Sequence, residues 1–550
     1  MQTLLLSDPI RAVEARGLAS TPPGALMDRA AEALAQACVE CLRECPAQTP
    51  VLALVGPGNN GGDALLAALK LADRGYPVQA IALSAESSTA TDASRVKAMW
   101  AERRLPLWPT SELDRLLADR PLVIDGLFGI GLSRALSGEA AAITQRLELD
   151  GLTVVAVDVP SGIDVDTGGI IGPEGSRAVR AALTVTMIAD KPGLHTGQGR
   201  VHAGAVRVAA LGLDDVSTET STQTTPALTL RSLKPTEPAG FDGPIASVGA
   251  LNELEWAASV LKHRSIDAHK GRFGDVLVLR GAQTMQGASL LAALGAQAVG
   301  VGRLFIGIDE GHTVADPLHP ELMTRAIDSS LLGEPGLGPA QAIIIGCGLG
   351  TAPQGRSKLI AALAHSAPLV VDADALNLIS TDPKLLASLK DRAQDARITV
   401  LTPHPLEAAR LLACSTARIQ GDRLGAACEL ARQTQAIVVL KGAGSVIATP
   451  TGAWSVNASG GPILATAGTG DVLAGVIGGL LAQGFAPEDA ASVGVCLHGA
   501  AGDQLAQAPE WAAGIGLPAS HLPGAIRQTI NRLMATALPE PASRSAGDHS

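Results

Sequence analysis

The sequence predicts an α/β protein with two domains of unequal size, and three observations lead to this prediction. Short runs rich in Val and Ile alternate with Ala- and Leu-rich helical stretches, which is the pattern of βαβ units and a parallel sheet. This alternation occurs twice, in two parts of the chain that a polar stretch separates. The 550 residues suffice for two large domains at roughly 150 residues or more per domain, and the hydrophobic share of 47% suffices for their cores.

The predicted strands follow one another in the same way in both parts. Residues 1–213 form the first domain, residues 214–244 a Ser-, Thr- and Pro-rich linker, residues 245–538 the second domain, and residues 539–550 a disordered tail. The strands expected in the first domain are 51–55, 78–83, 121–125, 153–158 and 183–188. Those expected in the second domain are 276–279, 342–346, 368–374, 398–402 and 437–442.

The charge and the aromatic content exclude some classes of function. The chain has 42 Lys and Arg against 53 Asp and Glu, a net charge of −11, which disfavours a general binder of phosphate backbones. Only 2% of the residues are aromatic, too few for rows of rings that stack single-stranded nucleic acid. We therefore expect no nucleic-acid partner.

Cysteine usage and hydropathy predict a soluble protein of the reducing cytoplasm. Seven cysteines are too sparse for a disulfide scaffold. Cys38, Cys41 and Cys45 fall at helical spacing; a thiol-lined helix face is favoured over zinc, which would need a fourth ligand. The N-terminus lacks a secretory signal, and the apolar stretch 287–302 falls short of the roughly 20 residues that span a bilayer.

Polar side chains follow three strands of the first domain. GPGNNGGD (56–63) follows strand 51–55, and its glycines would let backbone N–H groups approach a phosphate at a helix N-terminus. Asp125 ends the strand 121–125, and Asp158 and Ser161 lie at the end of 153–158. Each aspartate alone could equally be a helix N-cap or an Asx-turn. Because ligands bind outside the carboxyl ends of parallel strands, the three loops together favour a common site.

These motifs, GPGNNGGD, DGLFGIGL (125–132) and DVPSGIDVDTG (158–168), together with KPGLHTGQG (191–199), resemble the NAD(P)H-hydrate epimerase family. The resemblance covers residues 1–212 and implies a Rossmann-like α/β/α sandwich that interconverts R- and S-NAD(P)HX, nicotinamide cofactors hydrated at ring carbon 6. It implies a potassium ion held by Asn60, Asp125 and Ser161, and oxygen ligands suit such a hard cation. For Asp158 it implies a substrate contact, and we expect this residue to shuttle the proton. The implied substrate pocket comprises Asn59, Asn60, Gly61, Gly62, Asp63, Gly129, Ile130, Gly131, Leu132, Ser133, Arg134, Ala135 and Asp158.

TAGTGDVLAGVIGGLLAQG (466–484) carries the strongest chemical signal of the second domain. Its glycines and Asp471 lie at a turn that opens a small-residue helix, where N–H groups can stabilise the charge on a transferred phosphoryl group. Asp471 could accept a proton from a hydroxyl nucleophile, or it could merely cap the helix. KGAGS (441–445) and GCGLG (346–350) repeat the pattern of a strand followed by glycines, and none of these loops matches the Walker motif.

With VVDADALNL (370–378) and LTPHPLEAARLL (401–412), these loops resemble the ribokinase-like ADP/ATP-dependent NAD(P)H-hydrate dehydratases over residues 245–535. Members phosphorylate the C6 hydroxyl of the S epimer and eliminate phosphate, and the resemblance implies Mg²⁺ between the phosphates. Two positions depart from the family pattern, Cys347 in place of Pro and Leu406 in place of Gly. The implied hydrate contacts are Ala288, Gly348, His404 and Asp471, and those to the adenine nucleotide are Lys441, Gly442, Ala443, Gly444, Ser445 and Gly470.

The two resemblances in one chain favour a bifunctional repair enzyme, with Asp471 and Asp158 as catalytic residues. A ribokinase-like kinase with an accessory domain, or an N-terminal binding module without activity, are the alternatives. The choices between ADP and ATP, and between NADHX and NADPHX, stay open at this stage. His404 could also be a structural histidine. We further expect a homo-oligomer, because helices rich in Gly and Ala could pack against a copy of the chain.

Overall fold

The computed structural model describes residues 1–84, 91–213, 241, 245–309 and 318–536. The chain divides into two compact units, one of residues 3–251 and 417–426, the other of residues 1–2, 252–416 and 427–550. The predicted linker, apart from Phe241, and the predicted tail lie outside the described residues. The assignment of residues 417–426 to the N-terminal unit is a feature that no boundary in the sequence indicates.

The N-terminal unit is built on a fully parallel seven-stranded sheet with the order β4-β3-β2-β5-β6-β7-β8. The strands are β2 (Val51–Val55), β3 (Val78–Ala82), β4 (Leu107–Trp108), β5 (Leu122–Gly126), β6 (Val154–Val157), β7 (Leu183–Met187) and β8 (Ala205–Ala209). The helices are α1 (Ser7–Ser20), α2 (Ala25–Leu42), α3 (Asn59–Asp73), α4 (Thr91–Glu102), α5 (Leu113–Leu117), α6 (Gly138–Asp150) and α7 (Gly197–His202). Two further short strands are β1 (Gln2–Leu5) and β9 (Val248–Asn252).

Alternate residues of the central strands face two different helix layers. In β2, Val51, Ala53 and Val55 belong to the core that α2, α3 and α4 cover, whereas Leu52 and Leu54 belong to the core that α5 and α6 cover. All five side chains are almost fully buried. Near-continuous apolar runs are the composition that a parallel strand covered on both faces requires. The result is the predicted α/β/α sandwich.

The C-terminal unit contains a mixed sheet with the order β18-β17-β16-β15-β14-β13-β10-β11-β12, in which only the pairs of β17 are antiparallel. Its strands are β10 (Asp275–Leu279), β11 (Arg303–Asp309), β12 (Met323–Ile327), β13 (Ala342–Ile345), β14 (Leu369–Val371), β15 (Thr399–Leu401), β16 (Ile437–Leu440), β17 (Val446–Ala448) and β18 (Trp454–Asn457). Its helices are α9 (Leu254–Val260), α10 (Gln286–Ala298), α11 (Glu334–Leu337), α12 (Pro353–Ala364), α13 (Ala373–Thr381), α14 (Pro383–Gln394), α15 (Pro405–Leu411), α16 (Thr416–Gly421), α17 (Arg423–Thr434), α18 (Thr469–Ala482), α19 (Pro487–Leu505) and α20 (Leu522–Thr536).

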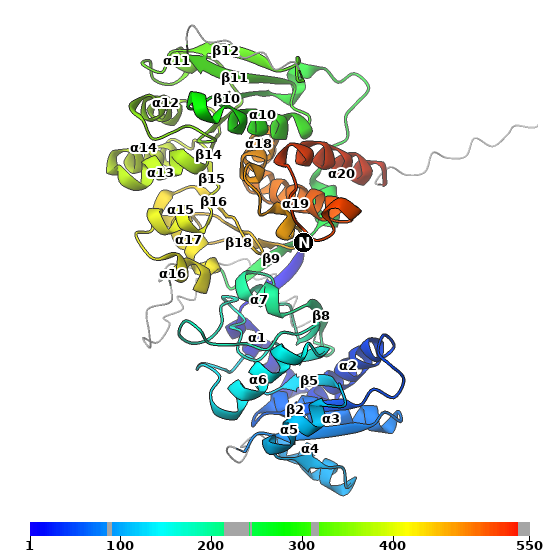
Figure 1. The fold of residues 1–550 in the computed structure, drawn as a ribbon. Helices are drawn as coiled ribbons and strands as arrows, with labels where there is room; N and C mark the ends of the chain where they lie inside the picture. Colours follow the sequence, from blue (N-terminus) through cyan, green and yellow to red (C-terminus); the bar gives the residue numbers. More distant parts are fainter. Residues whose placement is uncertain (85–90, 214–240, 242–244, 310–317, 537–550) are drawn as a thin grey trace, which may run out of the picture. The chain divides into compact units, whose positions relative to one another are not determined.

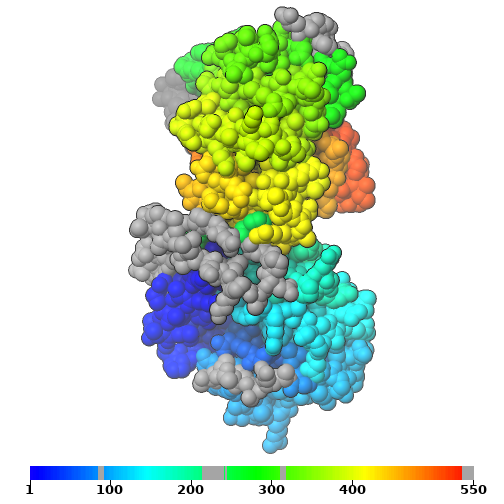
Figure 2. Space-filling view, turned by 90° about the vertical axis from the view of Figure 1, so that its left-hand side faces the viewer, coloured from blue at the N-terminus to red at the C-terminus, as the bar shows by residue number. Residues whose placement is uncertain are grey.

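Helices cover both faces of this second sheet. Val276, Val278 and Ile344 pack in one large core with α10, α18, α19 and α20, and Figure 1 shows α12, α13, α14 and α15 on the opposite face. Figure 2 faces this second layer, whose green to yellow residues cover the sheet. The unit is therefore a second three-layer α/β sandwich.

The small residues of α10 and α18 serve packing inside this unit. A Cβ on Gly475 would lie 1.9 Å from the carbonyl oxygen of Ala292, and one on Gly295 would lie 2.2 Å from that of Val472. Glycine thus lets the two helices approach each other closely. The small residues of these two helices pack against each other within one chain. They therefore no longer support the predicted homo-oligomer, which stays a prediction.

The ten predicted strands all occur, with ends shifted by a few residues. The prediction missed the hairpin of β17 and β18, the exposed edge strand β12, and also β11, a seven-residue strand that lies between β10 and β12. Cys45 lies three residues beyond the end of α2, so the cysteine trio does not share one helix, and all seven cysteines are free thiols. No helix among the described residues is long and apolar enough to span a membrane.

Candidate functional sites

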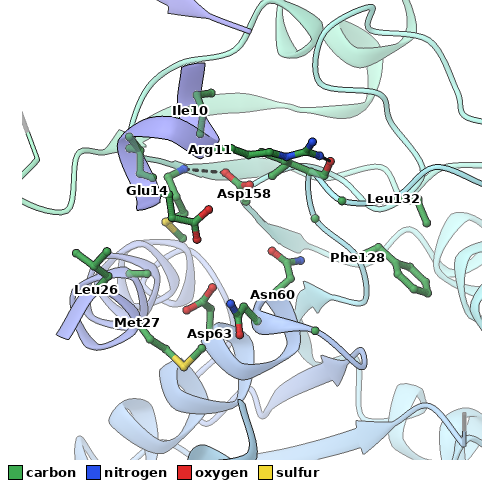
Figure 3. Close-up of a pocket in the computed structure, with 18 of the residues that line it drawn as sticks. Ile10, Arg11, Glu14, Leu26, Met27, Asn60, Asp63, Phe128, Leu132 and Asp158 are labelled. Atoms are coloured by element: carbon green, nitrogen blue, oxygen red, sulfur yellow. Dashed lines mark hydrogen bonds between the residues drawn. The ribbon is translucent and has the colours of Figure 1, made fainter. Parts of the chain in front are cut away.

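A cavity of about 520 Å³ opens at the carboxyl ends of β2 and β5, where the strand order of the first sheet reverses. Open α/β sheets bind ligands at such a switch point. The loop after β2 enters α3 at Asn59 and Asn60, and the loop after β5 follows on the other side (Figure 3). The predicted residues that line the cavity are Asn59, Asn60, Asp63, Gly129, Ile130, Gly131, Leu132, Ser133, Arg134 and Asp158.

Asp158 reaches this cavity from a left-handed backbone conformation, with φ of 64°, directly after β6. One carboxylate oxygen, Oδ1, accepts from Nζ of Lys191 at 2.8 Å and from the backbone N–H of Met187 at 2.9 Å. Lys191 is fully buried and also donates to Oγ1 of Thr186 at 2.6 Å. The buried side chain of Lys191 therefore fixes the position of Asp158, a role that sequence reasoning did not assign.

Further carboxyl groups line the same cavity, among them those of Asp63 and Glu14. Burial raises the pKa of Asp63 well above its ordinary value, and the charges of Asp158 and Glu14 add to this shift. Burial, followed by the charge of Asp158, also raises the pKa of Glu14. Figure 3 shows Asp63 and Asp158 directed into the cavity from opposite sides. The site thus combines a carboxyl group that tends to keep its proton with a carboxyl group that pairs with a buried lysine.

Asp125 lies behind the cavity wall and is fully buried. It accepts from the hydroxyl of Ser161 at 2.7 Å and from the backbone N–H of the same serine at 2.8 Å. Burial raises the pKa of Asp125 to about 6, although these hydrogen bonds act in the opposite direction. No cationic side chain pairs with Asp125 within the described part of the chain.

The amide group of Asn60 lies against Gly129, which follows the residue that contacts the Ser161 hydroxyl, Phe128. Its Oδ1 is 2.9 Å from the position that a Cβ on Gly129 would take, and its Nδ2 is buried without a hydrogen-bond partner among the described residues. A carboxylate, a hydroxyl and an amide, with one uncompensated charge, are suited to a hard monovalent cation. Of the three residues that the sequence grouped as cation ligands, Asp125 and Ser161 are in direct contact, and Asn60 approaches the loop after β5 with which both form hydrogen bonds.

Three predicted pocket residues do not line the cavity. A Cβ on Gly61 would lie 2.3 Å from the carbonyl oxygen of Gly56, and one on Gly62 would lie 2.9 Å from Met27, so both glycines allow α3 to pack closely. Ala135 lies against Gly172. Conversely, sequence reasoning missed the contribution of the first two helices, because their apolar spacing indicates only a core. The missed lining residues include Ile10, Arg11, Glu14, Leu18, Leu26, Met27, Ala30, Asp92, Phe128, Met187 and Ile188.

In the C-terminal unit, Asp471 lies in the first turn of α18, which begins after Gly468 in the left-handed conformation. Ligand atoms of Asp471, Asp372 and Cys347 all lie within 4.8 Å of one another. Burial, followed by the charge of Asp372, raises the pKa of Asp471 to about 6, whereas a hydrogen bond with Cys347 lowers it. Burial also raises the pKa of Cys347 well above its ordinary value, so this thiol stays protonated and can donate to Asp471.

Lys441 connects the KGAGS loop to this cluster. Its Nζ donates to Oδ1 of Asp372 at 2.7 Å and lies 3.2 Å from the position that a Cβ on Gly470 would take. Gly442 and Gly444 both have positive φ, 140° and 59°, which allows the loop to fold back after β16. Lys441 therefore lies close to Gly470 and to the start of α18, where Asp471 is located.

His404 begins α15 and forms a capping box with Glu407. Its Nδ1 accepts from the backbone N–H of Leu406 at 3.1 Å, and Glu407 Oε2 accepts from the backbone N–H of His404 at 2.8 Å. Burial, followed by the charge of Lys441, lowers the pKa of His404, and burial raises that of Glu407 to about 7. The histidine side chain is still 45% exposed, so it caps the helix while part of the ring remains accessible.

Gly348 and Ala288 lie in contact at the second strand-order reversal. Gly348 has a φ of 64°, and a Cβ there would lie 3.0 Å from that of Ala288. Gly346 has a φ of 119°, and a Cβ there would lie 1.8 Å from the carbonyl oxygen of Asp372. Only glycine therefore allows this loop to pass so close to Asp372. This close passage brings Cys347 and Gly348 to the same sheet edge as Asp372.

Comparison with known proteins gives consistent similarities for both units. The sequence model of the family described as NAD(P)H-hydrate dehydratase matches residues 276–523, and that of the YjeF-related protein N-terminus matches residues 23–193. The chain is 35% identical over 477 residues to a bifunctional NAD(P)H-hydrate repair enzyme of Moorella thermoacetica, covering 83% of each chain. It is 37% identical over 496 residues to one of Mycobacterium tuberculosis, covering 88% of this chain and 90% of the relative.

Among solved structures, the chain is similar to an ADP/ATP-dependent NAD(P)H-hydrate dehydratase from Bacillus subtilis co-crystallised with ATP and Mg²⁺. The identity is 30% and the TM-score 0.45, and the match covers 52% of this chain and 99% of the other.

Proposed function

The chain belongs to the family of bifunctional NAD(P)H-hydrate repair enzymes, and from that premise we propose how its two sites carry out the two reactions. Its function is the repair of hydrated nicotinamide cofactors: epimerisation of R- and S-NAD(P)HX, and nucleotide-dependent dehydration of S-NAD(P)HX to NAD(P)H. The observation that carries the proposal is the presence of two separate strand-end sites, one with paired acids and one with a phosphoryl-transfer loop.

The N-terminal cavity is proposed as the epimerase site. Epimerisation at C6 can proceed by opening of the bond between C6 and the ring nitrogen, in which the hydroxyl oxygen loses its proton and the nitrogen gains one. Asp158, which Lys191 positions through a hydrogen bond, would take the hydroxyl proton. Asp63, whose pKa burial raises, would supply the proton to nitrogen, and reclosure on the other face would reverse both transfers.

We propose that Asn60, Asp125 and Ser161 hold a potassium ion. The support is the buried charge of Asp125, which lacks a cationic side chain among the described residues, and the hydroxyl oxygen of Ser161, which lies against it. Oxygen donors suit such an ion, which would supply the missing positive charge and fix the loops after β5 and β6.

The cluster around Asp471 is proposed as the dehydratase site. Asp471 would take the proton of the C6 hydroxyl while the hydroxyl oxygen forms a bond to the terminal phosphorus of ADP or ATP, whose bond to the bridging oxygen breaks and releases AMP or ADP. The C6–O bond of the resulting phosphate ester then breaks and releases inorganic phosphate, and loss of a C5 proton restores the ring double bond. Lys441 and the N–H groups of the first turn of α18 would stabilise the phosphoryl charge.

Asp372 is the carboxylate that would hold Mg²⁺ together with phosphate oxygens, because Mg²⁺ is usually bound by one or two carboxylates and its substrate's phosphates. The neighbouring Cys347 thiol is a soft, protonated group and does not suit this ion. The bound ion would neutralise charge on the transferring group.

A cytoplasmic location fits the seven free thiols and remains part of the proposal.

One assay tests the proposal. The protein is incubated with mixed NADHX epimers, with and without ADP or ATP, while NADH absorbance and the epimer ratio are followed. We expect NADH only when nucleotide is present, and conversion of both epimers. Asp471→Asn should lower NADH formation about 100- to 10,000-fold and leave epimer exchange intact. Absence of nucleotide-dependent NADH from the wild type would refute the assignment.

A further inference from the structure

A second cavity, of about 300 Å³, lies at the carboxyl ends of β10, β11 and β13 in the C-terminal unit. β10 lies between β13 and β11, so the order of the sheet reverses beside this cavity. This is the position at which open α/β sheets bind ligands. None of the residues assigned above to the hydrate or the nucleotide lines it.

Arg280 follows β10 and lines this cavity. The residue is only 6% exposed, yet its guanidinium group forms no hydrogen bond or ion pair within the described residues. Burying a charge without a partner is unfavourable, and buried arginines are normally paired. An arginine left in this state beside an open cavity indicates a missing anionic partner.

The rest of the lining is also suited to an anion. Lys358 is buried, donating to the carbonyl oxygen of Arg280 and to Oδ2 of Asp309, both at 2.9 Å. With Arg280, Lys358 and Asp309 as the charged lining residues, the cavity has a net charge of +1. The first turn of the twelve-residue helix α12 also faces it, and the N-cap is Ala352, whose side chain cannot accept from the first N–H groups. These N–H groups are available to donate hydrogen bonds to a phosphoryl oxygen.

The cavity adjoins the proposed hydrate site. A Cβ on Gly281 would lie 1.7 Å from the carbonyl oxygen of Gly348, and the N–H of Ala282 donates to that oxygen at 2.9 Å. Gly348 is one of the residues that we assign to the hydrate. A hydrate whose nicotinamide ring contacts Gly348 can therefore reach into the cavity with a part of the molecule that is remote from the ring.

We propose that this cavity is a subsite of the dehydratase that binds a phosphoryl group of the dinucleotide substrate, with Arg280 as the residue that recognises it. The inference rests on the proposed function, because it takes NAD(P)HX as the substrate. It adds a binding residue remote from the reacting ring, whose contribution is to the binding of the substrate and not to the chemical step.

Arg280→Gln tests this assignment in the full chain. We expect the KM for the hydrate to rise about 10- to 100-fold, as for the loss of a charge-assisted hydrogen bond, with kcat and the KM for ADP within twofold of wild type. Arg356→Gln is the matched control, since Arg356 lies on α12 but pairs with Asp382 outside the cavity. This control should leave all three constants unchanged.

Gln354→Glu provides a second variant that preserves folding. Gln354 is exposed in the first turn of α12, where a glutamate is favourable to the helix but would repel a bound phosphoryl group. We expect the KM for the hydrate to rise without a fall in Tm. For Arg280→Gln we likewise expect no fall in Tm of the unliganded protein, because the substitution removes an unpaired buried charge. If Arg280 instead stabilised the fold, its replacement would lower Tm.

The two hydrates identify the phosphoryl group. An equal rise of KM for NADHX and NADPHX assigns the pyrophosphate, and a rise confined to NADPHX assigns the 2′-phosphate; either supports the subsite. An unchanged KM for both hydrates in both variants, or a rise in the KM for ADP instead, would overturn it. Failure of the wild type to form NADH at all would overturn the proposed function, and is thereby distinguished from failure of the subsite.

Discussion

At the scale of single residues, each unit uses burial to set the charge of its carboxyl groups. Asp63 and Asp471 have raised pKa values because they are buried, whereas Asp158 is held by the ammonium group of Lys191. The N-terminal site therefore offers an acid, Asp63, and a base, Asp158. The C-terminal site offers one base, Asp471, whose pKa is about 6. The assignments lead to two predictions about individual side chains.

Lys191→Met should destabilise the N-terminal unit by about 3–5 kcal/mol, because it leaves Asp158 as an uncompensated buried charge. Denaturant unfolding and the epimer exchange rate measure the effect. The double variant Asp158→Asn with Lys191→Met should recover most of the stability and no epimerase activity. Equal stability of the single and double variants would contradict the pairing, and dehydratase activity serves as the internal control.

Potassium should stabilise the protein more above pH 6 than below it. Burial raises the folded-state pKa of Asp125 to about 6 from an ordinary value of 3.8, so without a cation stability decreases as pH rises through this window. A bound cation would offset that loss. We expect KCl to raise Tm by about 2–4 °C at pH 7.5 relative to tetramethylammonium chloride, an effect of about 1 kcal/mol. Asp125→Asn should remove the difference; its persistence would place the ion elsewhere.

At the scale of elements, strand ends and the helices that follow them position the groups of both sites. Asp471 lies at the start of α18, whereas Cys347 comes from the loop after β13, and glycines with positive φ bring that loop to the cluster. The departure of Cys347 from the family pattern therefore places a thiol beside the proposed base. Leu406 is 45% exposed at the start of α15, and its backbone N–H donates to His404, a contact that does not depend on its side chain.

The dehydratase rate should rise with pH through about 6 and then level, because Asp471 acts only when it is deprotonated. In Cys347→Ala the acid limb should move to higher pH, since the thiol hydrogen bond that lowers the pKa of Asp471 is lost. The pH dependence of kcat with saturating ADP and hydrate measures this shift. Cys428→Ala, at a buried cysteine outside the cluster, is the control, and an unchanged limb in Cys347→Ala would remove the thiol from the site.

At the scale of the whole molecule, the two reactions are assigned to two sheets with separate hydrophobic cores. Each site is built from strand-end loops of its own sheet. A substitution in one site should therefore leave the other active, because distant sites without shared partners act independently.

This independence predicts complementation between two inactive variants. The double variant Asp158→Asn with Lys191→Met should convert only the S fraction of mixed NADHX, and Asp471→Asn should convert none. Mixed in equal amounts, they should convert both epimers at a rate within a few-fold of wild type, followed by NADH absorbance. A mixture that stops at the S fraction would show that the two steps require both sites in one chain.

The sequence by itself determined the two α/β units, their central strands except β11, and the loops that carry Asp158 and Asp471. Apolar runs and glycine-rich strand ends are local signals, because the backbone of a buried strand or a tight turn restricts its residues directly. The edge strands and the hairpin of β17 and β18 lacked such a signal.

Only the tertiary structure decided which distant residues meet. Lys191 reaches Asp158 across 33 positions, Glu14 of α1 lines the same cavity, and Arg280 is left beside a cavity without a partner among the described residues. An arginine after a strand looks the same in the sequence whether it is paired or not. Burial and partnership depend on how remote segments pack, and the same dependence sets the pKa values of Asp63 and Asp471.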